Sequence, residues 1–229
     1  MKRAYSVTLI LVFINIGMYL LQFLLGDVFT TSLMLIPEDV LWRPWTLFTS
    51  MFLHSPVSPM HLLFNMYVLF IFGGLIEQRI GSKRFLWVYL FAGVFAGALY
   101  SVFSEVPALG ASGAIMAVLG LAIMLLPDLR VLFFFVIPMS LRTAGIIFAL
   151  IDILGLFYPG SGIAHLAHLG GLFVGLVYGY YLIKKRKKFV NRFLRVEKPK
   201  RRSGKSRGSK ETIELSDDDL EEYIRSGRI

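Results

Sequence analysis

Long, nearly uninterrupted apolar runs constrain this chain more than any other feature. Of its 229 residues 56% are hydrophobic, and several runs approach the roughly 20 apolar residues that an α-helix needs to cross a bilayer. Lipid offers the backbone no hydrogen-bond partners, so such runs must be helical. The sequence therefore predicts an all-α membrane protein, a bundle of six transmembrane helices at residues 5–25, 61–76, 85–103, 112–126, 141–158 and 164–183.

Positive charges predict how these spans are oriented. Lys and Arg beside the spans fall on one side of the membrane, apart from Arg43, and cytoplasmic loops are the ones enriched in these residues. We therefore expect a multi-pass protein of the cell membrane with both termini in the cytoplasm. The first run is expected to stay as a span rather than be removed as a signal peptide, because it is long and no small-x-small cleavage site precedes Asp27.

The chain divides into a membrane body, residues 1–187, and a cytoplasmic tail, residues 188–229. Sixteen of the 24 Lys and Arg residues follow residue 183, so most of the chain's basic residues lie beyond the last span, whereas the net charge of the whole chain is +9. A basic segment beside a membrane is attracted to anionic lipid heads, and it has almost no aromatic residues on which nucleic-acid bases could stack. We expect membrane lipid as its partner and no nucleic acid, with a short acidic helix at 216–224.

The loop at residues 26–60 combines aromatic side chains with few charges. Trp42, Trp45, Phe48 and Phe52 favour the membrane–water interface over bulk water. This first loop is therefore expected to lie on or in the outer leaflet.

Polar residues inside the spans are few, and they converge at one depth. His61 and Asn65 are four residues apart and share a helix face at the outer end of the second span. Ser112 begins the fourth span, and His165 and His168 lie in the first turns of the sixth. Because polar groups in lipid are costly, such a group predicts a functional site.

Glycine spacing indicates which histidine meets the serine. His168 is followed by Gly171, Gly175 and Gly179, which clear one helix face for close approach by another helix. The fourth span presents its own small residues, at Gly113, Ala117 and Gly120. A serine at a helix N-terminus, with an imidazole in hydrogen-bond reach, has the parts of a nucleophile and its general base.

The pattern resembles the rhomboid family of intramembrane serine proteases. The resemblance covers nearly the whole membrane body, and its parts are specific in combination although each alone is weak. The matching residues, in family order, are Trp42-Arg43, His61-x-x-x-Asn65, Glu77 ahead of Gly81, Gly110-x-Ser112-Gly113, and Ala167-His168-x-x-Gly171-x-x-x-Gly175.

The resemblance implies a Ser112–His168 catalytic dyad without a required acid. His61, Asn65 and the Ser112 backbone N–H would stabilise the oxyanion. The substrate would be a transmembrane segment of another protein, which enters past the second and fifth helices and is cut near the outer face. No cofactor and no metal are implied. Residues expected to support the site structurally are Trp42, Arg43, Glu77, Gly110, Gly113, Met116, His165, Gly171 and Gly175.

Two positions depart from the family's pattern. Met116 stands where some members carry an aromatic that stacks on the catalytic histidine, and its thioether is expected to pack there instead. Asp152 is an acid in the outer half of the fifth span. We expect it to be a hydrogen-bonded or water-facing group rather than a third member of the dyad, so that its replacement by Asn leaves most proteolysis intact. His54 is expected to cap the turn of the first loop.

Two rival functions remain open. A zinc hydrolase could use His61, His165 and His168 as ligands, although the sequence lacks a recognised His and carboxylate spacing. A rhomboid-like protein could also bind and escort transmembrane segments without cutting them. Such relatives usually lack the serine or the histidine, and this chain has both.

Overall fold

The fold is a bundle of helices with one small hairpin at its edge. The structure is a computed structural model that describes residues 6–133, 136–158 and 162–196. The elements in chain order are α1 (Val7–Leu33), the 3-10 turn η1 (Pro37–Asp39), α2 (Thr46–Thr49), the 3-10 turn η2 (Ser50–Phe52), α3 (Pro59–Val68), the π-helical η3 (Leu69–Gly73), α4 (Gly74–Ile80), α5 (Ser82–Phe103), α6 (Ser112–Leu125), β1 (Arg130–Phe133), β2 (Ile137–Ser140), α7 (Leu141–Gly155) and α8 (His165–Val196).

Among the residues that the structure describes, four helices are long and apolar enough to cross a membrane. They are Val7–Leu33, the continuous stretch Pro59–Ile80, Ser82–Phe103 and His165–Phe189. The helices in the fourth and fifth predicted spans, α6 and α7, have 14 and 15 residues and are shorter than a bilayer-crossing helix. The structure thus bears out four of the six spans, and the count of six stays a prediction.

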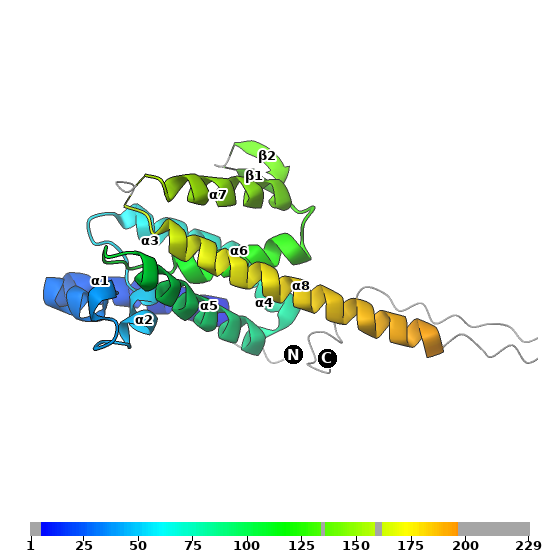
Figure 1. Ribbon diagram of the computed structural model, residues 1–229, viewed down its shortest axis with the longest axis horizontal. Coiled ribbons are helices and arrows are strands. Elements are labelled where there is room, and N and C mark those ends of the chain that lie inside the picture. The colour runs from blue at the N-terminus through cyan, green and yellow to red at the C-terminus, as the bar shows by residue number, and fades with distance from the viewer. Residues whose placement is uncertain (1–5, 134–135, 159–161, 197–229) are drawn as a thin grey trace, which may run out of the picture.

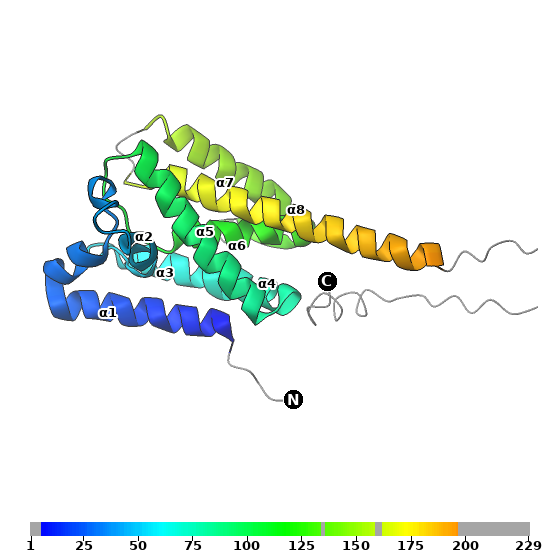
Figure 2. The ribbon, with the colours of Figure 1, turned by 60° about the horizontal axis from the view of Figure 1, so that its bottom comes forward.

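The short helix α6 lies at the centre of the bundle. Every residue from Gly113 to Ala122 is buried, and α6 packs against α5, α7 and α8. Figure 1 shows α7 at the edge beside the hairpin, and in Figure 2 α1 and α7 lie at opposite edges with α5, α6 and α8 between them. A helix that is apolar on all sides suits such a buried position, because no side of it needs to face water.

Three element boundaries differ from the sequence expectation. Residues 130–140 form an antiparallel hairpin, with Arg130 opposite Ser140, so the fold is not purely helical. Pro138 cannot donate a backbone hydrogen bond, and a short two-stranded hairpin tolerates it because both of its strands are edge strands. At the other end of the chain α8 runs on to Val196, beyond residues 183 and 187. The predicted acidic helix at 216–224 lies outside the described residues.

Helix α1 is interrupted where the first span was predicted to end. Gly26 has φ 74° and ψ −163°, a conformation that side-chain-bearing residues rarely adopt. The helix resumes after it, so the last turns up to Leu33 belong to the first loop rather than to the span.

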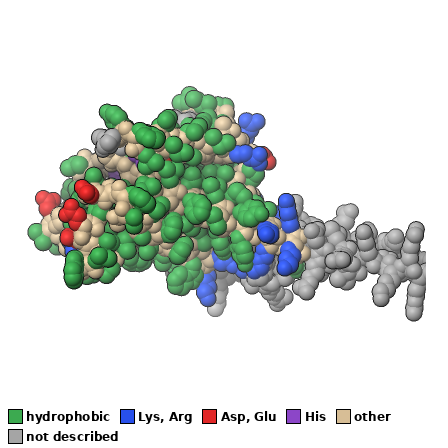
Figure 3. Space-filling view, in the orientation of Figure 1, with side chains coloured by type: hydrophobic (Ala, Val, Ile, Leu, Met, Phe, Trp, Pro, Cys, Tyr) green, Lys and Arg blue, Asp and Glu red, His purple; other side chains and the backbone are tan. Residues whose placement is uncertain are grey.

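Charge separates the two ends of the bundle. Figure 3 shows most of the visible Lys and Arg gathered at one end, near α4, α8 and the hairpin, and most of the visible Asp and Glu at the other, with apolar side chains between them. We call these the basic end and the acidic end. Large apolar side chains on the surface, such as Leu24 and Phe157 at 79% and 82% exposed, suit contact with lipid.

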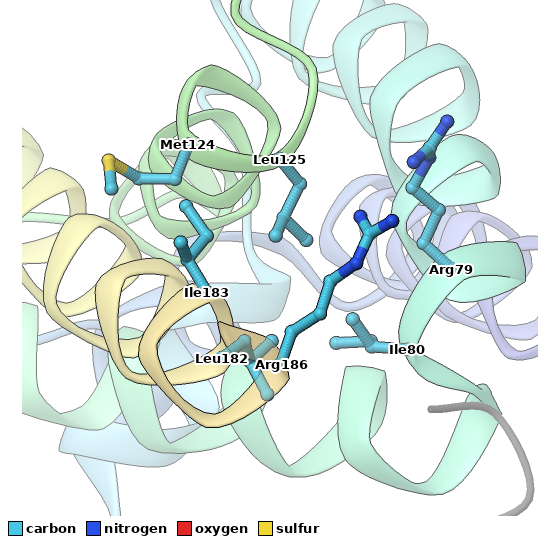
Figure 4. A pocket seen from close by; sticks show the side chains of 7 residues that line it. All are labelled: Arg79, Ile80, Met124, Leu125, Leu182, Ile183 and Arg186. Carbon is cyan, nitrogen blue, oxygen red and sulfur yellow. The ribbon is translucent and has the colours of Figure 1, made fainter. Parts of the chain in front are cut away.

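A pocket of about 180 Å³ opens at the basic end, between α4, α6 and α8 (Figure 4). It is lined by Arg79, Ile80, Met124, Leu125, Leu182, Ile183 and Arg186. Met124 is 12 residues along α6 from Ser112, or about 18 Å at 1.5 Å per residue. The chemistry predicted for Ser112 therefore lies away from this pocket, at the opposite end of α6.

Candidate active site

Helices α6 and α8 touch backbone to backbone, as the glycine spacing predicts. A Cβ added to Gly171 would overlap the Gly113 carbonyl oxygen, and one added to Gly175 would overlap the Ala117 carbonyl. A Cβ on Gly120 would lie 2.7 Å from the Leu172 carbonyl oxygen. Side chains at these positions would hold the two helices apart, so the small residues set their distance.

This contact brings the serine and the histidine together. Ser112 is the first residue of α6, and its Oγ lies 2.8 Å from Nε2 of His168 in the first turn of α8. The hydroxyl and the imidazole are partly buried, and the His168 side chain is 19% exposed. The distance is within the range of a hydrogen bond between a nucleophile and its general base.

The loop before Ser112 is pinned to the first loop. The backbones of Leu35 and Ala108 exchange two hydrogen bonds of 3.0 and 2.8 Å, and the Gly110 N–H donates to the Ser50 carbonyl at 3.0 Å. Gly110 has φ +132°, which a side chain would strain, and a Cβ there would lie 2.9 Å from the His61 ring. The loop thus needs glycine at 110 for its conformation and for room.

His61 lies beside Ser112, and Asn65 lies one turn along α3. The position of a Cβ on Gly110 is 2.9 Å from His61 Nε2 and 3.9 Å from Ser112 Oγ, which places both side chains around the same point. The Ser55 N–H donates to Nδ1 of His61 at 3.4 Å. Asn65 is buried, and one of its amide hydrogens bonds the His61 carbonyl at 2.7 Å. The amide carries a second hydrogen that can donate elsewhere.

Asp152 lies beside His168, although the sequence analysis did not expect it to act with the dyad. Its carboxylate oxygen Oδ1 lies 2.7 Å from Nδ1 of His165 and 3.0 Å from Nδ1 of His168. Asp152 is 4% exposed and His165 is 7% exposed. Helices α6, α7 and α8 therefore supply one connected chain of polar groups, from Asp152 through His168 to Ser112.

The first loop is tied to α1 by polar contacts. The Arg43 guanidinium donates to the Thr31 carbonyl at 2.7 Å and lies 3.5 Å from the Asp39 carboxylate. The Trp42 side chain is 83% exposed, so its ring does not brace the loop from inside. An exposed indole at this end of an apolar bundle suits the membrane–water interface.

His54 is a core residue and not the cap of a turn. Its side chain is fully buried, and its ring packs edge-on against the His61 ring at 5.1 Å between centroids. Its backbone N–H and carbonyl each bond the Gln22 side-chain amide at 3.0 Å. Burial, and secondarily the nearby His61, lower the pKa of His54 to about 3, so the ring is neutral at pH 7.

Glu77 gathers the basic ends of three helices. Its carboxylate accepts hydrogen bonds from the hydroxyls of Ser6, Thr8 and Ser82 at 2.6 to 2.7 Å, and from the N–H groups of Val7 and Thr8 at 2.8 and 2.9 Å. The N–H groups are unpaired ends of α1, where a carboxylate is favourable. Glu77 thus links α4 to the starts of α1 and α5.

Comparisons with known proteins identify the family. The Rhomboid domain model matches residues 41–185, which is more than half of the chain and includes Ser112 and His168. The chain belongs to the rhomboid family. Rhomboid protease GlpG of Haemophilus influenzae is 33% identical over 187 residues, which cover 80% of this chain and 93% of that protein.

Other relatives are longer than this rhomboid chain. Rhomboid protease GluP of Bacillus subtilis is 38% identical over 133 residues, 57% of this chain and 24% of that protein. The mitochondrial presenilin-associated rhomboid-like protein of Bos taurus is 36% identical over 164 residues, 66% of this chain and 43% of that protein. The chain thus spans about a quarter to less than half of these two relatives.

The structure also bears on the zinc alternative for this rhomboid. Among the described residues the metal-binding donor atoms that lie within 4.8 Å of one another belong to Asp152, His165 and His168, and the set does not include the predicted ligand His61. The donor atoms of the two histidines face the carboxylate at hydrogen-bond distances. These contacts therefore favour a hydrogen-bonded cluster over a zinc site.

Sequence reasoning underrated two polar residues of this rhomboid. An acid within an apolar span is a signal of function, but nothing in the sequence indicates that Asp152 faces α8 rather than lipid. Gln22 gave the same signal in the first span, and it proves to hold the backbone of residue 54. In each case the residue type indicated a functional or structural role, but the sequence did not show which way the helix turns that residue.

Proposed function

We propose that this rhomboid is an intramembrane serine endopeptidase that cleaves transmembrane segments of other membrane proteins. The observation that carries the proposal is the 2.8 Å approach of Ser112 Oγ to His168 Nε2 at the N-terminus of a buried helix. Serine is a poor nucleophile until a base takes its proton, and a neutral imidazole can take it. The relatives named as rhomboid proteases support the same reading.

In the proposed reaction His168 Nε2 accepts the proton of Ser112 as Oγ attacks the scissile carbonyl. The resulting oxyanion would be stabilised by His61, Asn65 and the Ser112 N–H, which is one of the N–H groups that a helix leaves unpaired. His168 would then protonate the leaving amine. In the second half of the reaction His168 would take a proton from water as the water attacks the acyl-enzyme, and would return that proton to Ser112 Oγ as the acid product leaves. Each oxyanion donor would contribute about 3 kcal/mol.

The substrate would reach the dyad sideways from the lipid, between α3 and α7. Support comes from the apolar side chains that α7 and α3 with its continuation η3 expose, among them Phe64 and Phe70 at 50% and 58%, and Leu150 and Leu154 at 53% and 68%. A transmembrane segment could pack on such surfaces without water. Cleavage near the outer face follows if the basic end is cytoplasmic, as the positive-inside tendency indicates. With α6 and α7 counted as spans, both termini would then be cytoplasmic.

The test is a cleavage assay in proteoliposomes with a reporter that carries one type I transmembrane segment. We expect the parent to cut it, and Ser112→Ala and His168→Ala each to lose at least about 10³-fold in rate. Ser101→Ala is the matched control, because that hydroxyl bonds the Gly97 carbonyl within its own helix. Equal cleavage by all four proteins would refute the dyad. A parent that binds the reporter as tightly as Ser112→Ala does, and never cuts it, would establish the escort function instead.

A further inference from the structure

Asp152 is a buried acid beside the proposed dyad, and the dyad itself does not require it. It lies one turn before the end of α7, and its Oδ1 faces the Nδ1 atoms of two histidines on α8. An ionised carboxylate can only accept hydrogen bonds, so each Nδ1 that bonds it must carry a proton. A neutral imidazole with its proton on Nδ1 leaves Nε2 free to accept.

We infer that Asp152 is a positioning residue that fixes His168 in the tautomer able to deprotonate Ser112. The inference rests on the proposed protease function, which it deepens. Nε2 of His168 faces Ser112 Oγ, and only an unprotonated Nε2 can take that proton. The opposite tautomer would direct an N–H at the serine and would leave the base occupied. Asp152 touches no reacting atom and acts only through the histidine.

His165 anchors the carboxylate in this arrangement. It lies three residues before His168, so both rings leave α8 on the same side. Its Nδ1 is nearer to Asp152 than that of His168, at 2.7 against 3.0 Å, and it is buried. Two N–H donors hold the carboxylate in place and satisfy part of the hydrogen bonding that burial takes from it.

The shape of α7 fits this contact. Gly155 follows Asp152 by three residues, on the same face of the helix, and a Cβ at Gly155 would overlap the His165 ring. The glycine leaves the space that the ring occupies. The end of α7 thus carries both the carboxylate that the histidines bond and the gap into which one of them packs.

The kinetic test compares variants of the full chain in proteoliposomes with the same reporter. We expect Asp152→Asn to lower kcat about 100-fold while KM stays within about threefold, because the substrate does not touch Asp152. The same change lowers kcat by about 10⁴ in a soluble serine-protease triad through the wrong histidine tautomer. Asp152→Glu, which keeps the carboxylate, should retain more activity than Asp152→Asn, and His165→Asn should lose less.

Asp128→Asn is the matched control, because that aspartate is exposed in the turn after α6, at the basic end. It should leave kcat unchanged. Rates are normalised to the amount of protein that elutes as a single monodisperse peak in detergent, so that a poorly folded fraction does not count. A loss in kcat of less than tenfold for Asp152→Asn, or a loss that disappears after this normalisation, overturns the assignment.

A spectroscopic readout separates positioning from a structural role. In ¹⁵N-histidine-labelled protein the His168 signal, assigned by its loss in His168→Ala, should show a proton on Nδ1 in the parent and on Nε2 in Asp152→Asn. An unchanged tautomer overturns the assignment. This measurement needs no substrate, so it tests the role of Asp152 independently of the protease function. The protease function itself would be refuted if the parent neither cut the reporter nor was labelled at Ser112.

Discussion

Adding one methyl group between α6 and α8 tests whether their spacing sets the geometry of the dyad. A Cβ on Gly120 would lie 2.7 Å from the Leu172 carbonyl oxygen, whereas ordinary contacts begin at 3.4 Å, so Gly120→Ala must move the helices apart by 3.4 − 2.7 = 0.7 Å at that point. The obstacle is backbone and cannot rotate away. Gly171→Ala should do more, because its Cβ would overlap the Gly113 carbonyl next to Ser112.

The expected losses in reaction rate and in stability follow from these distances. A separation of about 0.7 Å carried to the dyad would stretch its 2.8 Å hydrogen bond to the limit of such bonds. Since a misplacement of about 1 Å costs about 10²-fold in rate, we expect Gly120→Ala to lose about 10-fold and Gly171→Ala about 100-fold or more. Overpacking should also lower the free energy of unfolding by about 1 to 3 kcal/mol.

The assay measures fluorophosphonate labelling of Ser112 and thermal unfolding in detergent on the same samples. Gly17→Ala is the control, because no atom lies within 4 Å of the Cβ it would add on α1. It should match the parent in both measurements. Parent-like labelling by Gly171→Ala would refute the reasoning, since the dyad would then not depend on close approach of the helices.

Three further predictions concern the scaffold. The pKa of His54 is about 3 in the folded protein and about 6.5 in the unfolded chain. As the pH falls from 6.5 towards 3, the unfolded chain binds a proton that the folded protein does not bind, so the free energy of unfolding drops by up to about 1.4 kcal/mol per pH unit. A His54→Gln variant whose free energy of unfolding has the same pH slope as that of the parent would contradict this. Glu77→Gln should lower the free energy of unfolding by about 2 to 3 kcal/mol, because its amide cannot accept from both N–H groups and all three hydroxyls, while exposed Glu38→Gln should be neutral in the same denaturation series. Gly110→Ala should abolish labelling of Ser112, because its φ of +132° is strained and its Cβ would press on the His61 ring; normal labelling would show that the loop adapts.

The proximity of Ser112 and His168 could be predicted because small residues on two helix faces indicate which helices approach each other closely. Small residues at 113, 117 and 120 on one helix and at 171 and 175 on another permit close approach only on those faces, and the structure packs those faces together. The serine and histidine follow from that register. The same holds for the interruption of α1, since Gly26 ends the regular apolar run.

What could not be predicted depends on helix rotation and on contacts between distant segments. Asp152 was visible as an acid within a span, but its neighbours on α8 are set by how α7 packs, which a single sequence does not show. The hairpin at 130–140 was missed because its two strands have only four residues each and Pro138 argues against a strand. The burial of His54 depends on a bond to Gln22, 32 residues away.

The most direct measurement of the central claim is the intact mass of the protein after treatment with a fluorophosphonate, followed by mapping of the adduct. The account predicts one adduct, on Ser112, that forms in the parent and is lost in His168→Ala. An adduct that forms at the same rate without His168, or one on another serine, would show that the imidazole does not activate this hydroxyl and would contradict the account.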